Sequence, residues 1–204
     1  MPKVTRREAK KFVKVETVKT SKGSTDVHYD VLFAPQRHLT YSRYNEQDLV
    51  HVHEFEVIGN RSYPTKKGVS FTPGRLKMLM AFVDEIDEHL KQQMSKDTYK
   101  VSKEEDYRKH LGAGIHAGVS RKFDGVDLRR YWLPNGQKEI VATKNGIFLP
   151  SSQWTALKEK LGDLMIAKPE LSIAESCFHQ NQLGLMDCHE CDPFGSFREL
   201  YGSY

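Results

Sequence analysis

Cysteine and histidine side chains gather near the C-terminus, where they could hold a metal ion. The cluster consists of Cys177, His179, Cys188, His189 and Cys191. Because Cys188 and Cys191 have the CxxC spacing of a zinc knuckle, a structural zinc site formed by Cys177, His179, Cys188 and Cys191 is one hypothesis. The alternative is free thiols in an acidic tail, since the Cys-x-His spacing is unusual. Three cysteines, an odd number, argue against a disulfide framework.

Other residue patterns that could support catalysis are few. His51 and His53 would share one face of a strand, where they could chelate a metal or be exposed surface histidines. The sequence contains no GxxxxGK phosphate loop, no HExxH motif and no nucleophile elbow. We therefore expect a protein that is not an enzyme and needs no cofactor. A metal-dependent nuclease that uses the His and Cys residues is the enzyme-class alternative.

Charge is unevenly distributed along the 204 residues, although the formal net charge is only +4. Residues 1–25 carry eight Lys or Arg against two Glu, whereas residues 166–204 carry two basic against six acidic side chains. A basic segment of this kind attracts phosphates or serves in nuclear targeting. The sequence has neither an apolar run that could span a membrane nor an apolar secretory signal, so we expect a nuclear protein that is not secreted.

A repeat organises the middle of the chain, and it must position any functional side chains. The segment VHVHEFEV at 50–57 parallels VDLRRYWL at 126–133, and both alternate apolar and polar residues like strands. Further along, KKGVSFTPGRLKML at 66–79 parallels KNGIFLPSSQWTAL at 144–157. In each copy a strand is expected to lead into a helix.

The glycines and helix starts of the two copies also correspond. Gly68 and Gly146 are expected where the chain turns with positive φ between strands. Thr72 followed by Pro73 predicts a helix start, and in the second copy the cap is expected to move to Ser151 or Ser152. Apolar residues at helical spacing predict a packing stripe on each helix: Leu76, Leu79, Met80, Val83, Ile86 and Leu90, and then Trp154, Leu157, Leu161 and Leu164.

These elements predict an α+β fold of two ββββα repeats. Further candidate strands lie upstream, at 38–44 in the first copy and 115–123 in the second. The expected division is a basic N-terminal segment (1–36), a first repeat (37–94), a charged linker (95–112), a second repeat (113–166) and an acidic tail containing Cys and His (167–204). Because a core of 55 to 60 residues is marginal alone, the repeats are expected to pack together.

The second copy closely resembles the core domain of the Positive Cofactor Four family of transcriptional coactivators. The resemblance rests on VSRKFDGVDLRRYWLPNG and KNGIFLPSSQWTALKEKL, and more weakly on HLTYSRYNEQDLVHVHEFEV and KKGVSFTP in the first copy. It covers about residues 37–92 and 113–166. The resemblance implies curved antiparallel sheets of four strands, each followed by a helix, in a dimer that grips two strands of single-stranded DNA. Here that dimer would be an intramolecular pseudo-dimer.

The resemblance also implies binding residues in the second copy. The family's basic and aromatic positions fall on Arg121, Phe123, Arg129, Trp132 and Lys144. Single strands are held by cations on phosphates and by aromatic rings under unpaired bases, at roughly 1 to 3 kcal/mol per base. Simple alternation puts Arg129 and Trp132 on opposite faces of one strand, so one of them is expected in the core unless the strand twists or bulges.

The first copy matches these positions less well. The hairpin aromatic becomes Tyr44, the strand arginine becomes His53, and the strand tryptophan becomes the acidic Glu56. Arg43 lies one place from the expected basic position, while Lys66 and Lys67 keep both basic positions near the glycine.

We therefore expect a single-stranded-DNA-binding transcription coactivator or DNA-metabolism factor whose two halves differ. RNA, melted duplex and the transcription machinery are further candidate partners, and further homo-oligomerisation stays open. A protein-interaction scaffold without nucleic-acid binding is the third class of function, which the acidic Glu56 and the modest charge would permit.

Overall fold

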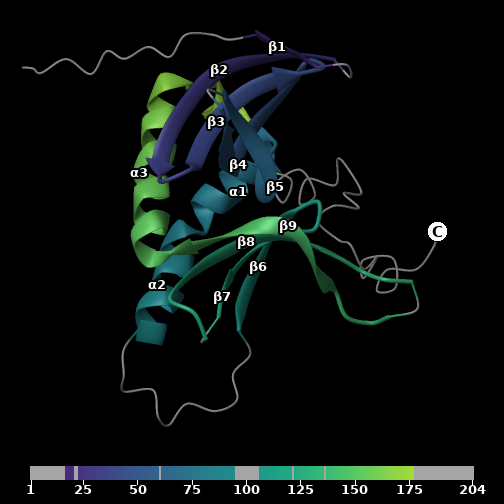
Figure 1. Cartoon of the computed structure of the whole chain (residues 1–204). Coiled ribbons are helices and arrows are strands. Elements are labelled where there is room, and N and C mark those ends of the chain that lie inside the picture. Colours follow the sequence, from purple (N-terminus) through teal and green to yellow (C-terminus); the bar gives the residue numbers. More distant parts are fainter. Residues whose placement is uncertain are drawn as a thin grey trace, which may run out of the picture.

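The computed structural model describes residues 17–20, 23–59, 61–94, 106–120, 122–135 and 137–176. Its first half is an antiparallel sheet whose five strands lie in chain order and lead into two helices (Figure 1). These elements are β1 (Thr17–Thr20), β2 (Gly23–Ala34), β3 (Arg37–Tyr44), β4 (Gln47–Ile58), β5 (Arg61–Phe71), α1 (Pro73–Ala81) and α2 (Val83–Met94).

The second half repeats this plan with four antiparallel strands in chain order and a long helix. These elements are β6 (Tyr107–Gly112), β7 (Ile115–Val119), β8 (Gly125–Trp132), β9 (Val141–Pro150), α3 (Ser151–Ala167) and the short α4 (Glu170–Ile173). The predicted α+β fold of two ββββα repeats is confirmed, with β1 as an additional strand on the first sheet.

Strands begin earlier than expected in both halves. β1 and β2 lie within residues 1–36, where we expected only a basic N-terminal segment, and β6 lies within the expected linker, 95–112. β2 carries an alternation of apolar residues, from Val27 to Phe33, that typifies a strand with one buried face. β6 is an edge strand of its sheet, where charged side chains are common, and its composition therefore resembles a linker.

The strand register shows that the two repeats are built on the same backbone plan. His53 of β4 pairs with Gly68 of β5, and Arg129 of β8 pairs with Gly146 of β9. Directly beyond each pair, three residues of the later strand oppose one of the earlier strand, so that both hairpins contain a bulge at the same position. The repeat seen in the sequence is therefore a repeat of register as well.

The two paired glycines do not form turns with positive φ, which corrects the sequence-based expectation. Both lie inside strands, and neither has a left-handed backbone. A Cβ added to Gly146 would lie 2.8 Å from Cγ of Arg129, and one added to Gly68 would overlap the His53 ring. Each position needs a glycine because the side chain of its register partner, His53 or Arg129, lies across the backbone of the glycine.

The predicted helix stripes are confirmed as packing surfaces, but the helix starts differ in detail. Leu76, Leu79, Ile86 and Leu90 are buried, as are the four residues of the second stripe. The first helix is interrupted at Phe82, and Thr72 precedes α1 without a side-chain capping bond. α3 is preceded by Pro150 rather than capped by Ser151 or Ser152, because the Ser151 hydroxyl donates instead to the Asp124 carboxylate.

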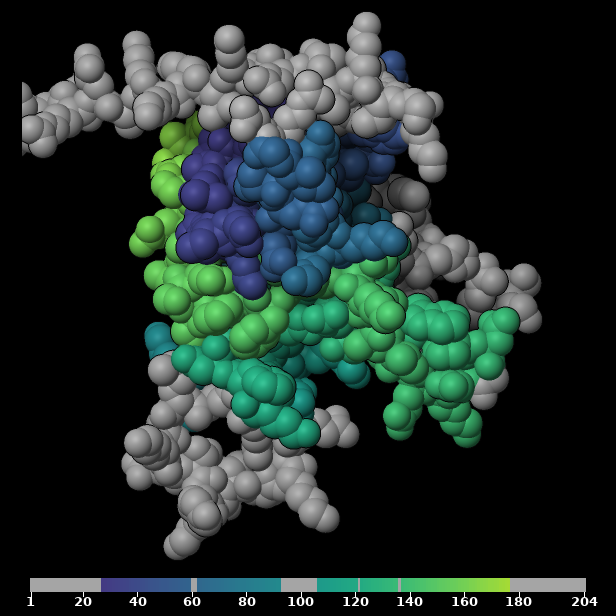
Figure 2. Space-filling model, in the orientation of Figure 1, coloured from purple at the N-terminus to yellow at the C-terminus, as the bar shows by residue number. Residues whose placement is uncertain are grey.

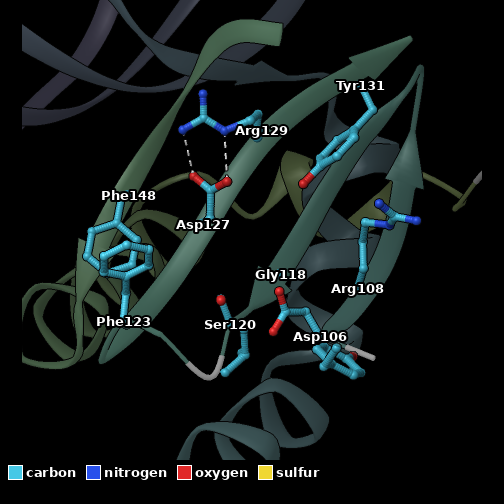
Figure 3. A pocket seen from close by; sticks show the side chains of 12 residues that line it. Asp106, Arg108, Gly118, Ser120, Phe123, Asp127, Arg129, Tyr131 and Phe148 are labelled. Carbon is cyan, nitrogen blue, oxygen red and sulfur yellow. Dashed lines mark hydrogen bonds and ion pairs between the residues drawn. The ribbon is translucent and has the colours of Figure 1, made fainter. Parts of the chain in front are cut away.

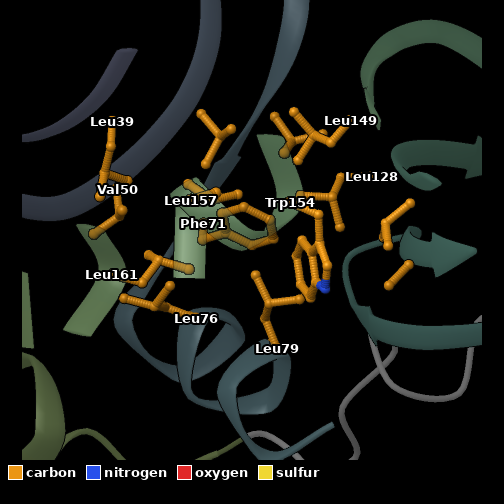
Figure 4. Close-up of a cluster of buried hydrophobic side chains, with 14 of the residues drawn as sticks. Leu39, Val50, Phe71, Leu76, Leu79, Leu128, Leu149, Trp154, Leu157 and Leu161 are labelled. Carbon is orange, nitrogen blue, oxygen red and sulfur yellow. The ribbon is translucent and has the colours of Figure 1, made fainter. Parts of the chain in front are cut away.

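The repeats share one hydrophobic core, because the helices of each repeat contact the sheet of the other. α3 lies along β2 and β3 of the first sheet as well as β8 and β9 (Figure 1). α1 contacts β6, and α2 contacts β7 and β8. In the space-filling view the two halves of the chain lie directly against each other (Figure 2). In the core, Phe71 of the first repeat gathers with Leu128, Leu149 and Trp154 of the second (Figure 4). Burying each such side chain contributes about 1.5 to 3 kcal/mol, so separating the repeats would be costly.

Polar contacts also join the repeats. The Trp154 indole Nε1–H donates to Asp87 Oδ1 at 2.7 Å, and the Lys158 ammonium group pairs with the same carboxylate. Arg37 of β3 donates through Nη1 to the Phe148 carbonyl of β9 at 2.5 Å.

No helix among the described residues is long and apolar enough to cross a membrane.

Candidate nucleic-acid interface

A groove of about 480 Å³ lies on the second sheet, on the face turned away from the helices (Figure 3). All four strands contribute to its lining, chiefly through Arg108, Gly118, Asp127, Arg129, Tyr131 and Phe148. The alternation of β8 explains the lining: Val126 and Leu128 are buried in the core, so Asp127, Arg129 and Tyr131 project from the other face.

Arg129 and Asp127 form a two-pronged ion pair in this groove. Arg129 Nε donates to Asp127 Oδ2 at 2.8 Å and Nη2 donates to Oδ1 at 3.0 Å (Figure 3). Arg129 Nη1 donates to the Thr143 carbonyl at 2.9 Å. The hydrogen bonds to Asp127 raise the pKa of Arg129. The guanidinium is therefore fixed in place and permanently charged.

Aromatic rings border the ion pair. Phe123 is 62% exposed and lies edge-on to Phe148, with 6.1 Å between the ring centroids. Tyr131 lies further along β8, and the guanidinium of the exposed Arg108 lies 5.1 Å from its ring centroid. The groove thus combines cations with rings that unpaired bases could stack on.

The structure brings together two of the residues predicted in the second copy, Phe123 and Arg129. Trp132 is 55% exposed but lies next to Tyr131, on the other face of β8 by alternation, and does not line the groove. Lys144 is exposed in the bulge of β9, beside the Thr143 carbonyl that Arg129 binds. Arg121 lies outside the described residues.

Sequence reasoning did not select Tyr131, Arg108 or Phe148. For Tyr131 the signal was present, because a residue two places from Arg129 on a strand shares its face. Arg108 and Phe148 come from other strands, and only the register places them beside β8. Phe148 pairs with Asp127, and Arg108 pairs with Gly118, which in turn pairs with Asp127.

The corresponding face of the first sheet carries a closed network of short polar side chains. His51 is hydrogen-bonded through Nε2 to Ser42 Oγ at 2.9 Å and through Nδ1 to Ser70 Oγ at 2.7 Å. His53 is bonded to the Thr65 carbonyl at 3.3 Å and to Ser70 at 3.4 Å. Burial lowers the pKa of His51 to about 4, with a smaller effect of the nearby His53, and burial also lowers the pKa of His53. Both histidines are neutral at neutral pH.

Most of the residues predicted in the first copy are already engaged within the protein. Arg43 binds both carboxylate oxygens of Asp48, and Lys67 pairs with Glu54 at 2.8 Å. Lys66 and Glu56 are exposed, and Tyr44 is half-buried at the end of β3.

The predicted zinc ligands Cys177, His179, Cys188 and Cys191 lie outside the described residues. Within residues 17–176, as far as the structure describes them, no group of three or more His, Cys, Asp or Glu side chains could hold a metal ion. The hydrogen bonds of His51 to two serine hydroxyls occupy both of its ring nitrogens.

Comparison with known proteins gave one match. Residues 34–82 match the family model described as Transcriptional Coactivator p15 (PC4). The matched segment covers β3, β4, β5 and α1 of the first repeat, the copy in which we found the weaker resemblance, and it does not extend to the second. The tandem of two family copies therefore stays a prediction. No curated protein and no solved structure matches the chain.

Proposed function

From the match of residues 34–82 to the transcriptional coactivator p15 (PC4) family model, we propose that the chain binds single-stranded DNA in the groove of its second sheet. The family points to a DNA-binding transcriptional coactivator acting in the nucleus, and it is not a known class of enzyme. The proposal adds the unpaired strand as the ligand, the groove as the site, and a role in transcription or another step of DNA metabolism.

The observation that carries the proposal is the pairing of cations and rings in one groove. Arg108 can neutralise a phosphate, Arg129 adds N–H donors although Asp127 offsets its charge, and Phe123 and Tyr131 offer faces or edges to bases. In a duplex the bases stack on one another and cannot reach such rings, whereas unpaired bases can. This difference favours single-stranded over double-stranded DNA.

Gly118 gives independent support, because the fold does not require a glycine there. It lies in the middle of β7 without a left-handed backbone, and an added Cβ would meet only two carbonyl oxygens, at 3.5 and 3.9 Å. A glycine inside a strand weakens it and often marks the close approach of a ligand. Here it keeps the groove open beside Asp127, its register partner.

In this proposal the first repeat supports the binding half, and the two repeats act as an asymmetric pseudo-dimer. Arg37 of the first sheet holds the carbonyl of Phe148, a residue of the groove wall. The polar face of the first sheet is satisfied by its own hydrogen bonds, which leaves little for a nucleic acid to gain there.

Fluorescence anisotropy with one labelled oligonucleotide, free and annealed to its complement, tests the proposal on the full chain. We expect tighter binding of the free strand and an affinity that falls as salt rises. An RNA strand of the same sequence, added as a competitor, measures the preference for DNA. Equal affinity for single strand and duplex, or no binding of either, would overturn the proposal. Cleavage of the probe on addition of Mg²⁺ or Zn²⁺ would instead favour a nuclease.

A further inference from the structure

The two repeats present equivalent outer faces, one on each sheet, so the chain could hold one segment of DNA or two. Starting from the pairs His53–Gly68 and Arg129–Gly146, the register identifies one row of side chains across each face. The row on the first sheet consists of Asp30, Thr40, His51 and Ser70, and the row on the second sheet consists of Arg108, Gly118, Asp127 and Phe148. Differences between the two rows decide which face can bind a strand.

The first position of the row carries opposite charges on the two sheets. Arg108 is exposed at the groove, with its guanidinium 5.1 Å from the Tyr131 ring centroid. The first sheet has Asp30 at this position, with its carboxylate 2.8 Å from Nδ1 of His38 and its side chain 35% exposed. A guanidinium attracts the phosphates of a strand, whereas a carboxylate repels them. A strand therefore gains a cationic anchor on the second sheet and meets a repelling group on the first.

The other positions of the row differ in space and in stacking surface. Gly118 leaves the second face open, whereas Thr40 fills the equivalent place on the first face and is itself only 8% exposed. Phe148 contributes a ring to the groove, whereas Ser70 is a short hydroxyl that is hydrogen-bonded to His51 at 2.7 Å. At these positions the first face offers neither the hollow nor the ring that an unpaired base would use.

The groove of the second sheet has room for one short segment of a strand. Its lining follows β8 from Gly125 to Tyr131, a distance of about 20 Å at the usual rise of a β-strand. This length suits about four nucleotides, the lower end of the site sizes known for single-strand-binding domains. One segment therefore fills the site, and any further contact would need a second surface.

We propose that the chain holds one segment of unpaired DNA, on the second sheet alone, so that its ligand is a single linear strand rather than the two separated strands of a melted duplex. The proposal rests on the proposed binding of single-stranded DNA in this groove. Asp30 and Thr40 exclude a second strand from the first sheet, although the backbone plan of the two faces is the same.

Counting the bound strands tests the inference directly on the full-length protein. A fixed amount of a labelled strand of about eight thymines, at a concentration well above the dissociation constant, is titrated with the protein. We expect saturation at one strand for each chain, and saturation at two strands for each chain would overturn the inference. No binding of this strand or of longer single strands would instead overturn the proposed function.

A comparison of two duplexes tests the inference through affinity. One duplex carries a gap that exposes one unpaired strand, and the other carries a bubble of mismatches of the same length that exposes two. We expect their affinities to agree within about threefold, because the groove takes one strand at a time. If both faces bound, the second contact would be intramolecular and the bubble would bind about 100-fold more tightly or better. A preference for the bubble above about tenfold therefore overturns the inference.

Charge reversals on the two sheets provide a matched pair of variants. Arg108→Glu should weaken all binding about tenfold, because no second site keeps the affinity of the parent protein. Lys66→Glu, at an exposed position of the first repeat, makes the same change of charge and should alter the affinity by less than about threefold.

Two results with these variants would overturn the inference. The first is an Arg108→Glu protein that keeps the parent affinity for all or part of the strand, and the second is a loss in Lys66→Glu as large as the loss in Arg108→Glu. The strand count and the duplex comparison use the unaltered protein, so a misfolded variant would not leave the inference untested.

Discussion

The outer faces of the two sheets have the same strand register, but the side chains of the second face border an open groove, whereas those of the first face form hydrogen bonds with one another. Matching the register gives the pairs Thr40 and Gly118, His51 and Asp127, His53 and Arg129, Ser70 and Phe148, with the first residue of each pair on the first sheet. On the first sheet short hydroxyls and neutral imidazoles bond to one another. On the second sheet a guanidinium, a carboxylate and aromatic rings face an open groove.

A backbone carbonyl accepts a hydrogen bond at the equivalent position of each face. His53 contacts the Thr65 carbonyl and Arg129 contacts the Thr143 carbonyl, and each carbonyl lies in the bulge of its hairpin. Because the scaffold is the same, the difference in function should reside in a few side chains. Exchanging them one at a time tests that conclusion.

The largest effect on binding is expected from Arg129→His, which gives the second face the residue of the first. It removes a fixed cation and leaves Asp127 without its partner, so we expect single-stranded DNA to bind about 10- to 100-fold more weakly, with a salt slope smaller by about 0.7. Anisotropy titrations at several salt concentrations measure both quantities.

The reverse change, His53→Arg, is the matched control. Position 51 offers no acid to hold a guanidinium, so binding should change by less than about twofold. A gain at His53→Arg as large as the loss at Arg129→His would mean that the two faces are interchangeable, and the comparison would fail.

Gly118→Thr is expected to weaken binding about tenfold while leaving the fold intact. The threonine, which stands at the equivalent position 40, would fill the open space beside Asp127, yet its Cβ meets only ordinary contacts. Because threonine suits a strand better than glycine does, the free energy of unfolding should stay constant or rise by up to about 1 kcal/mol. Urea denaturation and anisotropy on the same samples check both expectations.

Thr40→Gly makes the opposite exchange on the first face, where it should lower the free energy of unfolding and leave binding unchanged. If Gly118→Thr lowers stability and binding together, the glycine serves the fold, and its support for the groove is lost.

Adjacent residues on opposite faces of β8 give a finer test. Tyr131 lines the groove and Trp132 does not, although Trp132 is the residue that the family resemblance selects. We expect Tyr131→Ala to weaken binding about five- to tenfold through the loss of one stacking face, and Trp132→Ala to change it by less than about twofold. Glu56→Ala, at the position in the first repeat equivalent to Trp132, should have no effect. A larger loss of affinity in Trp132→Ala than in Tyr131→Ala would mean that the DNA strand binds on the other face of β8.

Much of the scaffold could be predicted from the sequence because it depends on local patterns. The alternation of 50–57 and 126–133 predicted strands, and the spacing from Leu76 to Leu90 and from Trp154 to Leu164 predicted buried helix faces. β6 was missed because an edge strand tolerates charges that also typify a linker.

The groove could not be predicted in the same way, because its residues meet across strands. Nothing near Gly146 in the sequence indicates that Arg129 crosses it, so the glycine suggested a turn. The open space at Gly118 has meaning only once Asp127 and Phe148 are known to lie beside it. Resemblance to a family selects positions, whereas the register decides which of them share a face.

The smallest effect is expected in the dependence of stability on pH. An unfolded histidine titrates near pH 6.5, whereas burial lowers the pKa of His51 to about 4. As the pH falls from about 6.5 to 4, the unfolded chain binds a proton that the folded face excludes, so the free energy of unfolding decreases in this window. Burial also lowers the pKa of His53, which adds to the decrease in stability. On the second face, burial lowers the pKa of His116 to about 4, so that this histidine contributes to the decrease as well.

We therefore expect the combined variant His51→Gln with His53→Gln to lose less free energy of unfolding between pH 7 and pH 4.5 than the parent protein loses, by on the order of 1 kcal/mol. His116→Gln should reduce the loss by a smaller amount. Urea denaturation at the two pH values measures the difference. If His116→Gln flattens the dependence more than the combined variant does, the first face is not the more strongly proton-linked one. The hydrogen-bond network of His51 and His53 would then not account for the difference between the first face and the groove.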